Sequence, residues 1–161
     1  MRCYHLNNMY MSSIQQGIQS AHAQMELFVK YQTPTTQKSM LYDWATEHKT
    51  MIVLNGGFLS DMVAAYEFID TDENPYPYVK FHESEEALGG ILTNIAIVLP
   101  EKSYKLSEFI RNRFVDMQLK LDPKLSEETA AKVIETLQSF GKYTQYEIDL
   151  AAMMNNFRLA S

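Results

Sequence analysis

The sequence predicts an α/β protein: a three-layer sandwich in which a mixed sheet of about four strands has helices on both faces, with a C-terminal helical extension. Residues 51–54 and 91–99 are nearly all apolar, which is typical of strands covered on both faces. Strand and helix patterns alternate at first, and only helix patterns follow. We therefore expect an α/β domain over residues 1–101 and a helical extension over residues 102–161 packed on it.

Composition indicates a folded protein. The 161 residues are 46% hydrophobic and 21% charged, values that favour one packed domain with an elaboration. No apolar run approaches the roughly 18 residues that span a bilayer, and the chain does not open with the apolar block of a secretory signal. A single cysteine, Cys3, excludes an internal disulfide and is expected to be a buried small hydrophobe. We expect a cytoplasmic protein with no membrane partner.

The formal net charge of −6 is unevenly distributed. Residues 102–124 hold six Lys or Arg against three acids, giving +3, so the rest of the chain sums to −9. A local basic face of this kind can meet a phosphate backbone, and the alternative is an ordinary solvated helix surface. Arg111 and Arg113 are its candidate substrate-binding residues.

The first strand and the first long helix organise the domain. Residues 3–6 are expected to form a strand that ends at Asn7 and Asn8, because asparagine favours turns. The helix over residues 11–31 starts at Ser12 or Ser13, each followed three residues later by a glutamine that completes a capping box. We expect its apolar stripe to face the core: Ile14, Ile18, Ala21, Met25 and Phe28.

A polar line runs beside this stripe at the same helical spacing. It consists of Gln15, Gln19, His22 and Glu26. Such a line is either a solvated flank or the wall of a site, and the sequence alone leaves both interpretations open. A lone histidine beside an apolar stripe is more often a hydrogen-bonded structural residue than a ligand or a base.

Four further elements follow in the predicted sheet domain before the strand over residues 91–99. A second helix places five residues on one face: Met40, Leu41, Trp44, Ala45 and His48. Residues 51–54 are the expected central strand, and the following Gly56-Gly57 lacks the spacing of a nucleotide-binding fingerprint. A helix follows with Leu59 to Ile69 as its apolar part, then an edge strand at residues 79–82 after two prolines.

From Ser103 onward, the sequence predicts three helices. The first carries the apolar stripe Leu106, Phe109, Ile110, Phe114 and Met117. Ser126 is expected to cap the second. Thr144 and Glu147 form a capping box for the third, whose Met153 and Met154 make a homodimer conceivable.

Taken together, these pieces resemble the type 2 peptidyl-tRNA hydrolases. In that family a strand ends in an Asp-Leu-x-Met turn and leads into a helix with Gly-Lys-x-x-x-Gln-x-x-His-Ala. Here the turn position is held by Asn8-Met9-Tyr10-Met11, and Gln19 and His22-Ala23 match the helix motif in register. Trp44 precedes the apolar strand, as in the family. The resemblance covers residues 2–101; a branch from large tailed phages is a second candidate relationship, which no motif supports.

The resemblance implies site residues and one departure. The family's lysine aligns with Gln15, which has no charge to stabilise an oxyanion. Counted back from Pro100 without gaps, the family's aspartate falls on His82 and its threonine on Asn94. Glu83 and Thr93 take those places if the intervening loop is two residues shorter.

Two functions remain open. In the first, the fold is kept for binding an RNA end, a nucleotide-like small molecule or a host protein, and the chemistry is lost. In the second, the chain hydrolyses a peptidyl-tRNA-like ester, with Glu83 or His22 as base and Thr93 assisting. Asn8, Gln15 and Gln19 would orient the substrate, and Arg111 with Arg113 would hold a tRNA phosphate. No cofactor and no metal site is expected, since His82, Glu83 and Glu86 lack a second ligand cluster.

Overall fold

The computed structural model describes residues 1–118, 135 and 143–160, and the side chains of residues 113–118 lie outside that description. The chain divides into two compact units. The sheet unit consists of Met1–Glu101 together with Phe157–Ser161, and the helical unit consists of Lys102–Asn156. The two units are described separately below.

The sheet unit contains a five-stranded mixed sheet in the order β3-β4-β1-β2-β5. Its strands are β1 (Arg2–Asn7), β2 (Met51–Asn55), β3 (Tyr78–His82), β4 (Leu92–Leu99) and β5 (Arg158–Leu159). β1 and β2 are parallel, whereas β4 is antiparallel to both β1 and β3, and β5 is antiparallel to β2. The predicted α/β class with a mixed sheet is confirmed, with one more strand than expected.

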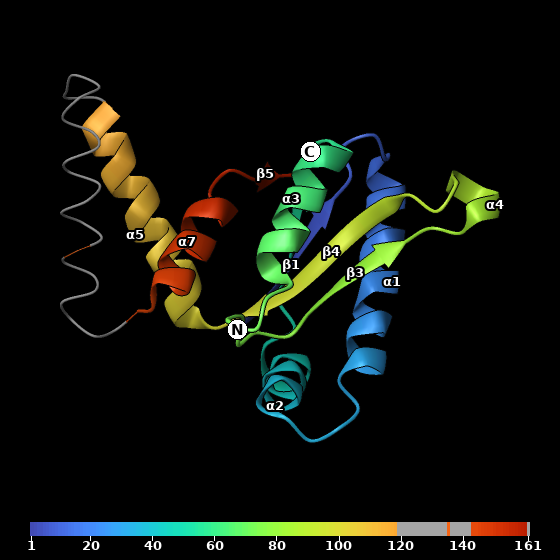
Figure 1. Ribbon diagram of the computed structural model, residues 1–161, viewed down its shortest axis with the longest axis horizontal. Helices are drawn as coiled ribbons and strands as arrows, with labels where there is room; N and C mark the ends of the chain where they lie inside the picture. Colours follow the sequence, from blue (N-terminus) through green and yellow to red (C-terminus); the bar gives the residue numbers. More distant parts are fainter. Residues whose placement is uncertain (119–134, 136–142, 161) are drawn as a thin grey trace. The chain divides into compact units, whose positions relative to one another are not determined.

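Helices cover both faces of this sheet (Figure 1). α1 (Ser13–Lys30) packs on β3 and β4, and α3 (Leu59–Ile69) packs on β4 from the other side. The core on the α1 face also includes α2 (Thr36–Asp43) and the π-helical turn η1 (Trp44–His48). Its buried members are Cys3, Ala23, Leu27, Leu41, Trp44, Val79, Ala96 and Val98.

The expected buried stripe of α1 is wrong except at Phe28, which packs half-buried against the core. The helix begins as predicted, because Ser12 and Gln15 form a complete capping box. However, Ile14, Ile18 and Met25 are 78%, 47% and 69% exposed, and the buried residues are instead Gln19, Ser20, Ala23 and Leu27. The cause is the sheet surface below α1: it carries buried polar side chains, which pack against small and hydrogen-bonding residues better than against isoleucine and methionine.

The expectation that residues 51–54 form the central strand is also wrong. β1 holds the centre, β2 is second from the edge, and Leu54 is the one buried residue of β2. The strand beyond β2 is β5, whose Leu159 and Arg158 pair with Leu54 and Asn55. A two-residue strand after a helical region has no periodic pattern, so the sequence predicted helix there.

The helical unit contains α5 (Glu101–Gln118) and α7 (Gln145–Met154). Leu106 and Ile110 of α5 pack against Ile148 and Ala151 of α7. Phe109 is 39% exposed, so the predicted stripe of α5 is buried only in part. The helix predicted to start at Ser126 lies outside the described residues.

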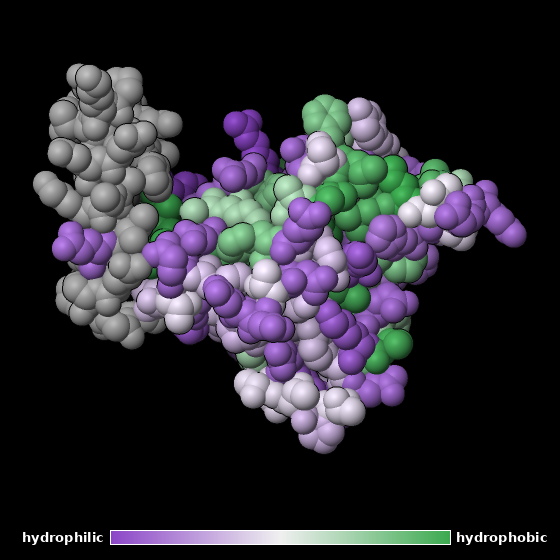
Figure 2. Space-filling view, in the orientation of Figure 1, coloured by the Kyte–Doolittle hydropathy of each residue, from purple (hydrophilic) through white to green (hydrophobic). Residues whose placement is uncertain are grey.

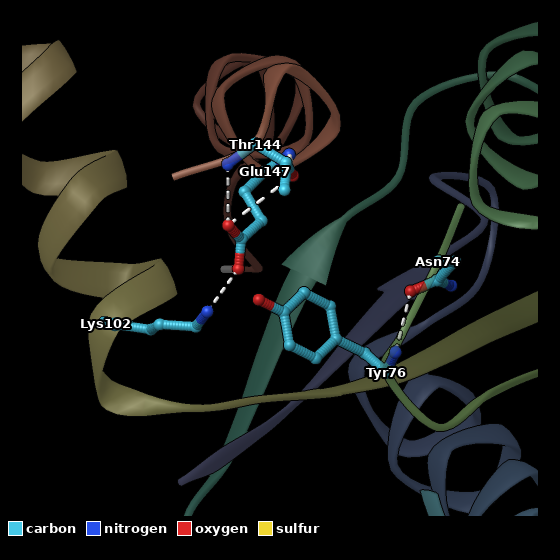
Figure 3. A network of polar contacts seen from close by, with 5 residues as sticks. All are labelled: Asn74, Tyr76, Lys102, Thr144 and Glu147. Atoms are coloured by element: carbon cyan, nitrogen blue, oxygen red, sulfur yellow. Dashed lines mark hydrogen bonds and ion pairs between the residues drawn. The ribbon is translucent and has the colours of Figure 1, made fainter. Parts of the chain in front are cut away.

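The predicted capping box of α7 is present (Figure 3). Thr144 Oγ1 accepts from Glu147 N at 3.2 Å, and Thr144 N donates to Glu147 Oε2 at 2.9 Å. The other carboxylate oxygen of Glu147 pairs with Lys102 Nζ of α5. One of the six cations in the predicted basic segment is therefore neutralised inside its own unit.

In the described ranges of the chain, none of the helices combines the length and the apolar character needed to cross a membrane.

Candidate functional site

The strands that position the candidate residues finish at one end of the sheet. β1, β2 and β3 run in the same direction, because β4 is antiparallel to both β1 and β3. Their carboxyl ends therefore meet, at the position where open α/β sheets commonly bind ligands. Asn8 directly follows β1, Glu83 directly follows β3, and Thr93 lies near the start of β4 at the same end.

Three predicted site residues form a hydrogen-bonded line there. Thr93 Oγ1 donates to Gln19 Oε1 at 2.9 Å, and Gln19 Nε2 donates to Glu83 Oε2 at 2.7 Å. Thr93 and Gln19 are buried, whereas Glu83 is partly exposed. The buried hydroxyl thus fixes which end of the Gln19 amide faces outward, and the amide N–H group then orients the carboxylate of Glu83.

An irregularity in the sheet aims Thr93 toward α1. Phe81 pairs with Asn94, but His82 pairs with Leu92, so Thr93 is an extra residue on β4. Consecutive strand residues normally point to opposite faces, whereas a bulge redirects a side chain. Thr93 and Asn94 can therefore both reach α1, where they contact Gln19 and Ser20.

The surroundings of Glu83 favour its ionised form. Ser84 N donates to Oε1 at 2.9 Å and Gln19 donates to Oε2, and the nearby His22 adds a favourable charge interaction. These contacts lower the pKa of the Glu83 carboxyl group below its ordinary value. A carboxylate of this kind is a good hydrogen-bond acceptor and a weak general base.

His22 stands beside this line. It lies one helical turn after Gln19 on α1, it is exposed, and its ring centroid is 4.9 Å from that of Phe81. The imidazole and the phenyl ring are tilted by 58° and present an aromatic edge next to the carboxylate.

Asn8 is buried and supports the loop after β1. Its backbone N–H group donates to Thr93 O at 3.0 Å, and its side-chain amide contacts Leu92 O at 3.4 Å. Its side-chain oxygen accepts from Tyr10 N at 3.1 Å. The Asn8 side chain therefore ties this loop to β4 and is engaged with the backbone on both sides.

The remaining predicted residues are not joined to the line. The side-chain oxygen of Gln15 accepts from Ser12 N at 3.0 Å, so this residue caps α1. Arg111 is exposed on α5 in the helical unit. Arg113 is on the same helix, but its side chain is outside the described set, as are Lys120 and Lys124.

A buried polar network behind the line was missed by the sequence analysis. Asn94 Nδ2 donates to Asn7 Oδ1 at 2.8 Å, and Asn7 Nδ2 donates to Ser20 Oγ at 3.0 Å. In this orientation of the Asn94 amide, its oxygen accepts a hydrogen bond from His5 Nδ1 at 3.2 Å. The His5 proton is then on Nδ1, so His5 Nε2 accepts from the Cys3 thiol at 3.3 Å. The sequence held one signal for this network: Cys3, His5 and Asn7 are every second residue of β1, so their side chains lie on the same face.

Burial determines the protonation of this network. His5 is fully buried, and loss of solvation lowers its pKa to about 4 although the bond to Asn94 opposes the shift. Burial also raises the pKa of the Cys3 thiol well above its ordinary value. Both groups are neutral at physiological pH, so the network holds the sheet to α1 and offers no reactive thiolate.

Exposed apolar side chains surround the same end of the sheet. Tyr10 and Phe58 are 77% and 51% exposed, and their ring centroids are 5.8 Å apart. Leu59 and Val63 at the start of α3 add to this surface. In Figure 2 the corresponding region beside α3 is coloured as hydrophobic.

A separate cleft of about 390 Å³ lies between α3 and β3. Its lining residues are Val63, Tyr66, Glu67, Asp70, Lys80, His82 and Leu92. Asp70 accepts from the Tyr78 hydroxyl at 2.6 Å, and Lys80 Nζ lies 4.5 Å from the centre of the Tyr66 ring. The cleft shares no residue with the Thr93–Gln19–Glu83 line.

The chemistry available at the line is recognition of hydrogen-bond donors. It provides an oriented carboxylate and an adjacent imidazole, and no described lysine or arginine contacts it, so a developing oxyanion would lack the positive charge that such a residue supplies. Among the described residues, no group of three His, Cys, Asp or Glu is arranged to hold a metal ion. In comparisons with known proteins, the chain matches no family model and no curated protein.

Proposed function

We propose that the chain is a divergent, cytoplasmic relative of the type 2 peptidyl-tRNA hydrolases that binds a terminal nucleoside, either at an RNA end or in a nucleoside-like small molecule, without hydrolysing an ester. The observation that supports this proposal is the hydrogen-bonded line Thr93–Gln19–Glu83 at the end of the sheet.

The carboxylate of Glu83 suits the two neighbouring hydroxyl groups of a ribose. Each of its oxygens accepts one hydrogen bond from the protein and keeps a second acceptor position. Acidic side chains at the ends of α/β strands bind ribose hydroxyl groups in this way. The exposed ring of His22, near Glu83, is available to a base, because aromatic surfaces stack on bases of any identity.

Charge favours a nucleoside over a polyphosphate at this site. The sheet unit holds six Lys or Arg against twelve Asp or Glu, so it carries the whole net charge of −6. A run of phosphates would be repelled by this unit, whereas ribose hydroxyl groups and a base are neutral. We propose binding without hydrolysis for two reasons: the sheet unit has this excess of acids, and position 15 holds an uncharged glutamine.

The proposal is tested by titrating the protein with adenosine and with 2′,3′-dideoxyadenosine, using amide and side-chain NMR shifts. We expect adenosine to shift the signals of Gln19 and Thr93 and the dideoxy compound to bind at least about tenfold more weakly, since a bond to a charged acceptor contributes about 1.5–3 kcal/mol. Glu83→Gln should weaken adenosine binding, and Glu86→Gln on the exposed turn of α4 (Glu85–Leu88) is the matched control.

Two results would remove the proposal. One is equal binding of the two nucleosides, and the other is a shift pattern confined to Tyr66 and Lys80 in the cleft between α3 and β3. A short RNA with an intact 3′ ribose, compared with the same RNA after periodate oxidation, tests whether the ligand is an RNA end or a free nucleoside.

Ester hydrolysis is the second candidate, and it is favoured by the convergence of Gln19, Glu83 and Thr93. A peptidyl-tRNA cleavage assay separates the two functions. We expect no turnover above background. If the protein shows turnover, and Glu83→Ala abolishes it while Glu86→Ala does not, the chain is an esterase and the binding proposal is wrong.

A further inference from the structure

The cleft between α3 and β3 is built from one side of a helix and one face of an edge strand. Its α3 residues follow one another at three- and four-residue spacing, which places them on one side of the helix: Val63, Tyr66, Glu67 and Asp70. Lys80 and His82 are two residues apart on β3, so their side chains leave the same face of the strand. Val79 and Phe81 take the opposite face and pack on the core below α1. The cleft therefore lies on the other face of the sheet from the Thr93–Gln19–Glu83 line.

One wall of the cleft is organised by two tyrosines around an aspartate. Asp70 accepts from the Tyr78 hydroxyl at 2.6 Å, and the Tyr66 hydroxyl also bonds to this carboxylate. The bond from Tyr78, followed by the bond from Tyr66, lowers the pKa of the Asp70 carboxyl group below its ordinary value. The two rings have centroids 6.2 Å apart and are tilted by 57°. The charge of Asp70 is thus already shared by two hydroxyl donors of the wall.

Three other polar groups of the cleft are not committed in this way. Lys80 Nζ lies 4.5 Å from the centre of the Tyr66 ring, and no described carboxylate is within ion-pair distance of it. Glu67 has no hydrogen-bond or ion-pair partner within the described ranges. His82 Nδ1 donates to Gly90 O at 2.9 Å, so Nε2 of the neutral ring can accept a further hydrogen bond. The cleft thus presents one cation, one anion and one acceptor to a ligand.

The rest of the lining is aliphatic. Leu92 at the start of β4 is buried, and Val63 of α3 is half-exposed. The cleft volume of about 390 Å³ is near the lower end of the range of about 300–1,000 Å³ that is usual for small-molecule pockets. A ligand that fits here is therefore small and carries a short aliphatic body.

The charges of the cleft select a zwitterion. A ligand with only a negative charge would pair with Lys80, but it would be repelled by Glu67 and by the excess of acids in the sheet unit. A ligand with only a positive charge would be repelled by Lys80 and would leave this ammonium group without an anion. A molecule that carries both charges can satisfy Lys80 and Glu67 together.

We propose that this cleft binds a small aliphatic α-amino acid in its free, zwitterionic form. The carboxylate of the ligand pairs with Lys80 Nζ, and its ammonium group donates to Glu67 and to His82 Nε2. The aliphatic side chain lies on Val63 and Leu92. The cleft shares no residue with the nucleoside site proposed above, and the amino-acid site does not depend on it.

The proposal is tested by titrating the full chain with leucine and following amide and side-chain NMR shifts. We expect shifts at Tyr66, Lys80 and Leu92 and a dissociation constant of about 1 mM, because a ligand of this size makes few contacts. Leucinamide lacks the carboxylate, and 4-methylpentanoate lacks the ammonium group. Each should bind at least about tenfold more weakly than leucine, because a bond to a charged group is lost.

Two variants assign the two charges of the ligand to their partners. Lys80→Met keeps the apolar stem, and it should abolish the preference for leucine over leucinamide. Glu67→Gln should instead abolish the preference for leucine over 4-methylpentanoate. The matched controls are Lys38→Met, whose Nζ lies 5.4 Å from the centre of the Tyr42 ring outside the cleft, and Glu73→Gln on the exposed turn after α3. Both controls should bind leucine as the wild type does, and circular dichroism confirms folding of all four variants.

Several results would overturn the amino-acid site. These are equal binding of leucine and leucinamide, equal binding of leucine by the wild type and Lys80→Met, and no shift in the cleft up to about 50 mM leucine. Leucine shifts confined to Gln19 and Thr93 would also overturn it. Adenosine titration of the same samples separates this inference from the nucleoside proposal: loss of one binding activity with the other intact removes only the corresponding site.

Discussion

Gln19 donates to Glu83 at 2.7 Å, although 64 positions separate the two residues in the chain. The bond joins the first helix to the loop after β3, and the Thr93 hydroxyl holds its other end. The orientation of an exposed carboxylate thus depends on a buried hydroxyl that does not touch it.

Thr93→Val tests that dependence, because valine keeps the shape and removes the hydroxyl. We expect the pKa of Glu83 to rise toward its ordinary value as Gln19 loses its fixed orientation, and a loss of about 1 kcal/mol in the free energy of unfolding. Carboxyl NMR titration and urea denaturation measure the two effects. Thr46→Val, which removes an exposed hydroxyl bonded to Tyr42 O, is the control and should leave the pKa of Glu83 unchanged.

His5 predicts how stability depends on pH. Its pKa is about 4 in the folded protein and about 6.5 when unfolded, so the unfolded chain binds more protons between these values. The free energy of unfolding should therefore fall as the pH falls from about 6.5 toward 4, by up to about 2 kcal/mol at pH 5. Urea denaturation at a series of pH values measures it. In the His5→Asn variant, the free energy of unfolding should be lower, and it should change less with pH over this range.

Asn94→Ala should be among the most destabilising single changes in the sheet unit. It removes the partner of His5, Asn7 and Ser20 at once and leaves buried polar groups without bonds, each costing about 1–3 kcal/mol. We expect a loss of about 3 kcal/mol in the free energy of unfolding, measured by urea denaturation. The control is Asn112→Ala on the exposed side of α5, which should change the free energy of unfolding by less than about 0.5 kcal/mol. Similar effects of the two variants would contradict a structural role for the network.

Glu147→Ala tests the cap of α7. The change removes the acceptor of Thr144 N and leaves Lys102 without its carboxylate. We expect the free energy of unfolding to fall by about 1–2 kcal/mol, because the cap and a partly buried ion pair disappear together. Thermal unfolding followed by circular dichroism measures it, and Asp149→Ala on the exposed side of α7 is the control.

Local chemistry accounts for the parts of the fold that the sequence predicted well. Ser12 with Gln15 and Thr144 with Glu147 begin helices where expected, because a capping box is complete within four residues. The strand over residues 91–99 was recognised because an uninterrupted apolar run has few alternatives, and β4 is buried along its whole length.

The errors have tertiary causes. Periodicity identified α1 as amphipathic but assigned the wrong face to the core, because part of the sheet beneath it presents the polar side chains His5, Asn7 and Asn94 beside its apolar ones. A rule that apolar residues face inward fails where part of the interior is polar.

The candidate site was predicted in part. Gln19, Glu83 and Thr93 were all named from the sequence, but the alternatives His82 and Asn94 could not be separated from Glu83 and Thr93. The bulge at Thr93 brings Thr93 to Gln19, which also bonds Glu83, and a one-residue shift of register leaves no trace in composition or hydropathy.

The pairing of β5 with β2 has a consequence for synthesis of the chain. Residues 158 and 159 emerge from the ribosome about a hundred positions after the strand that they cover. Until then Leu54 and Asn55 lack their β5 neighbours, and a nascent edge of this kind is open to pairing with another polypeptide. During translation, β2 therefore remains an open edge of the sheet until the last residues of the chain are made.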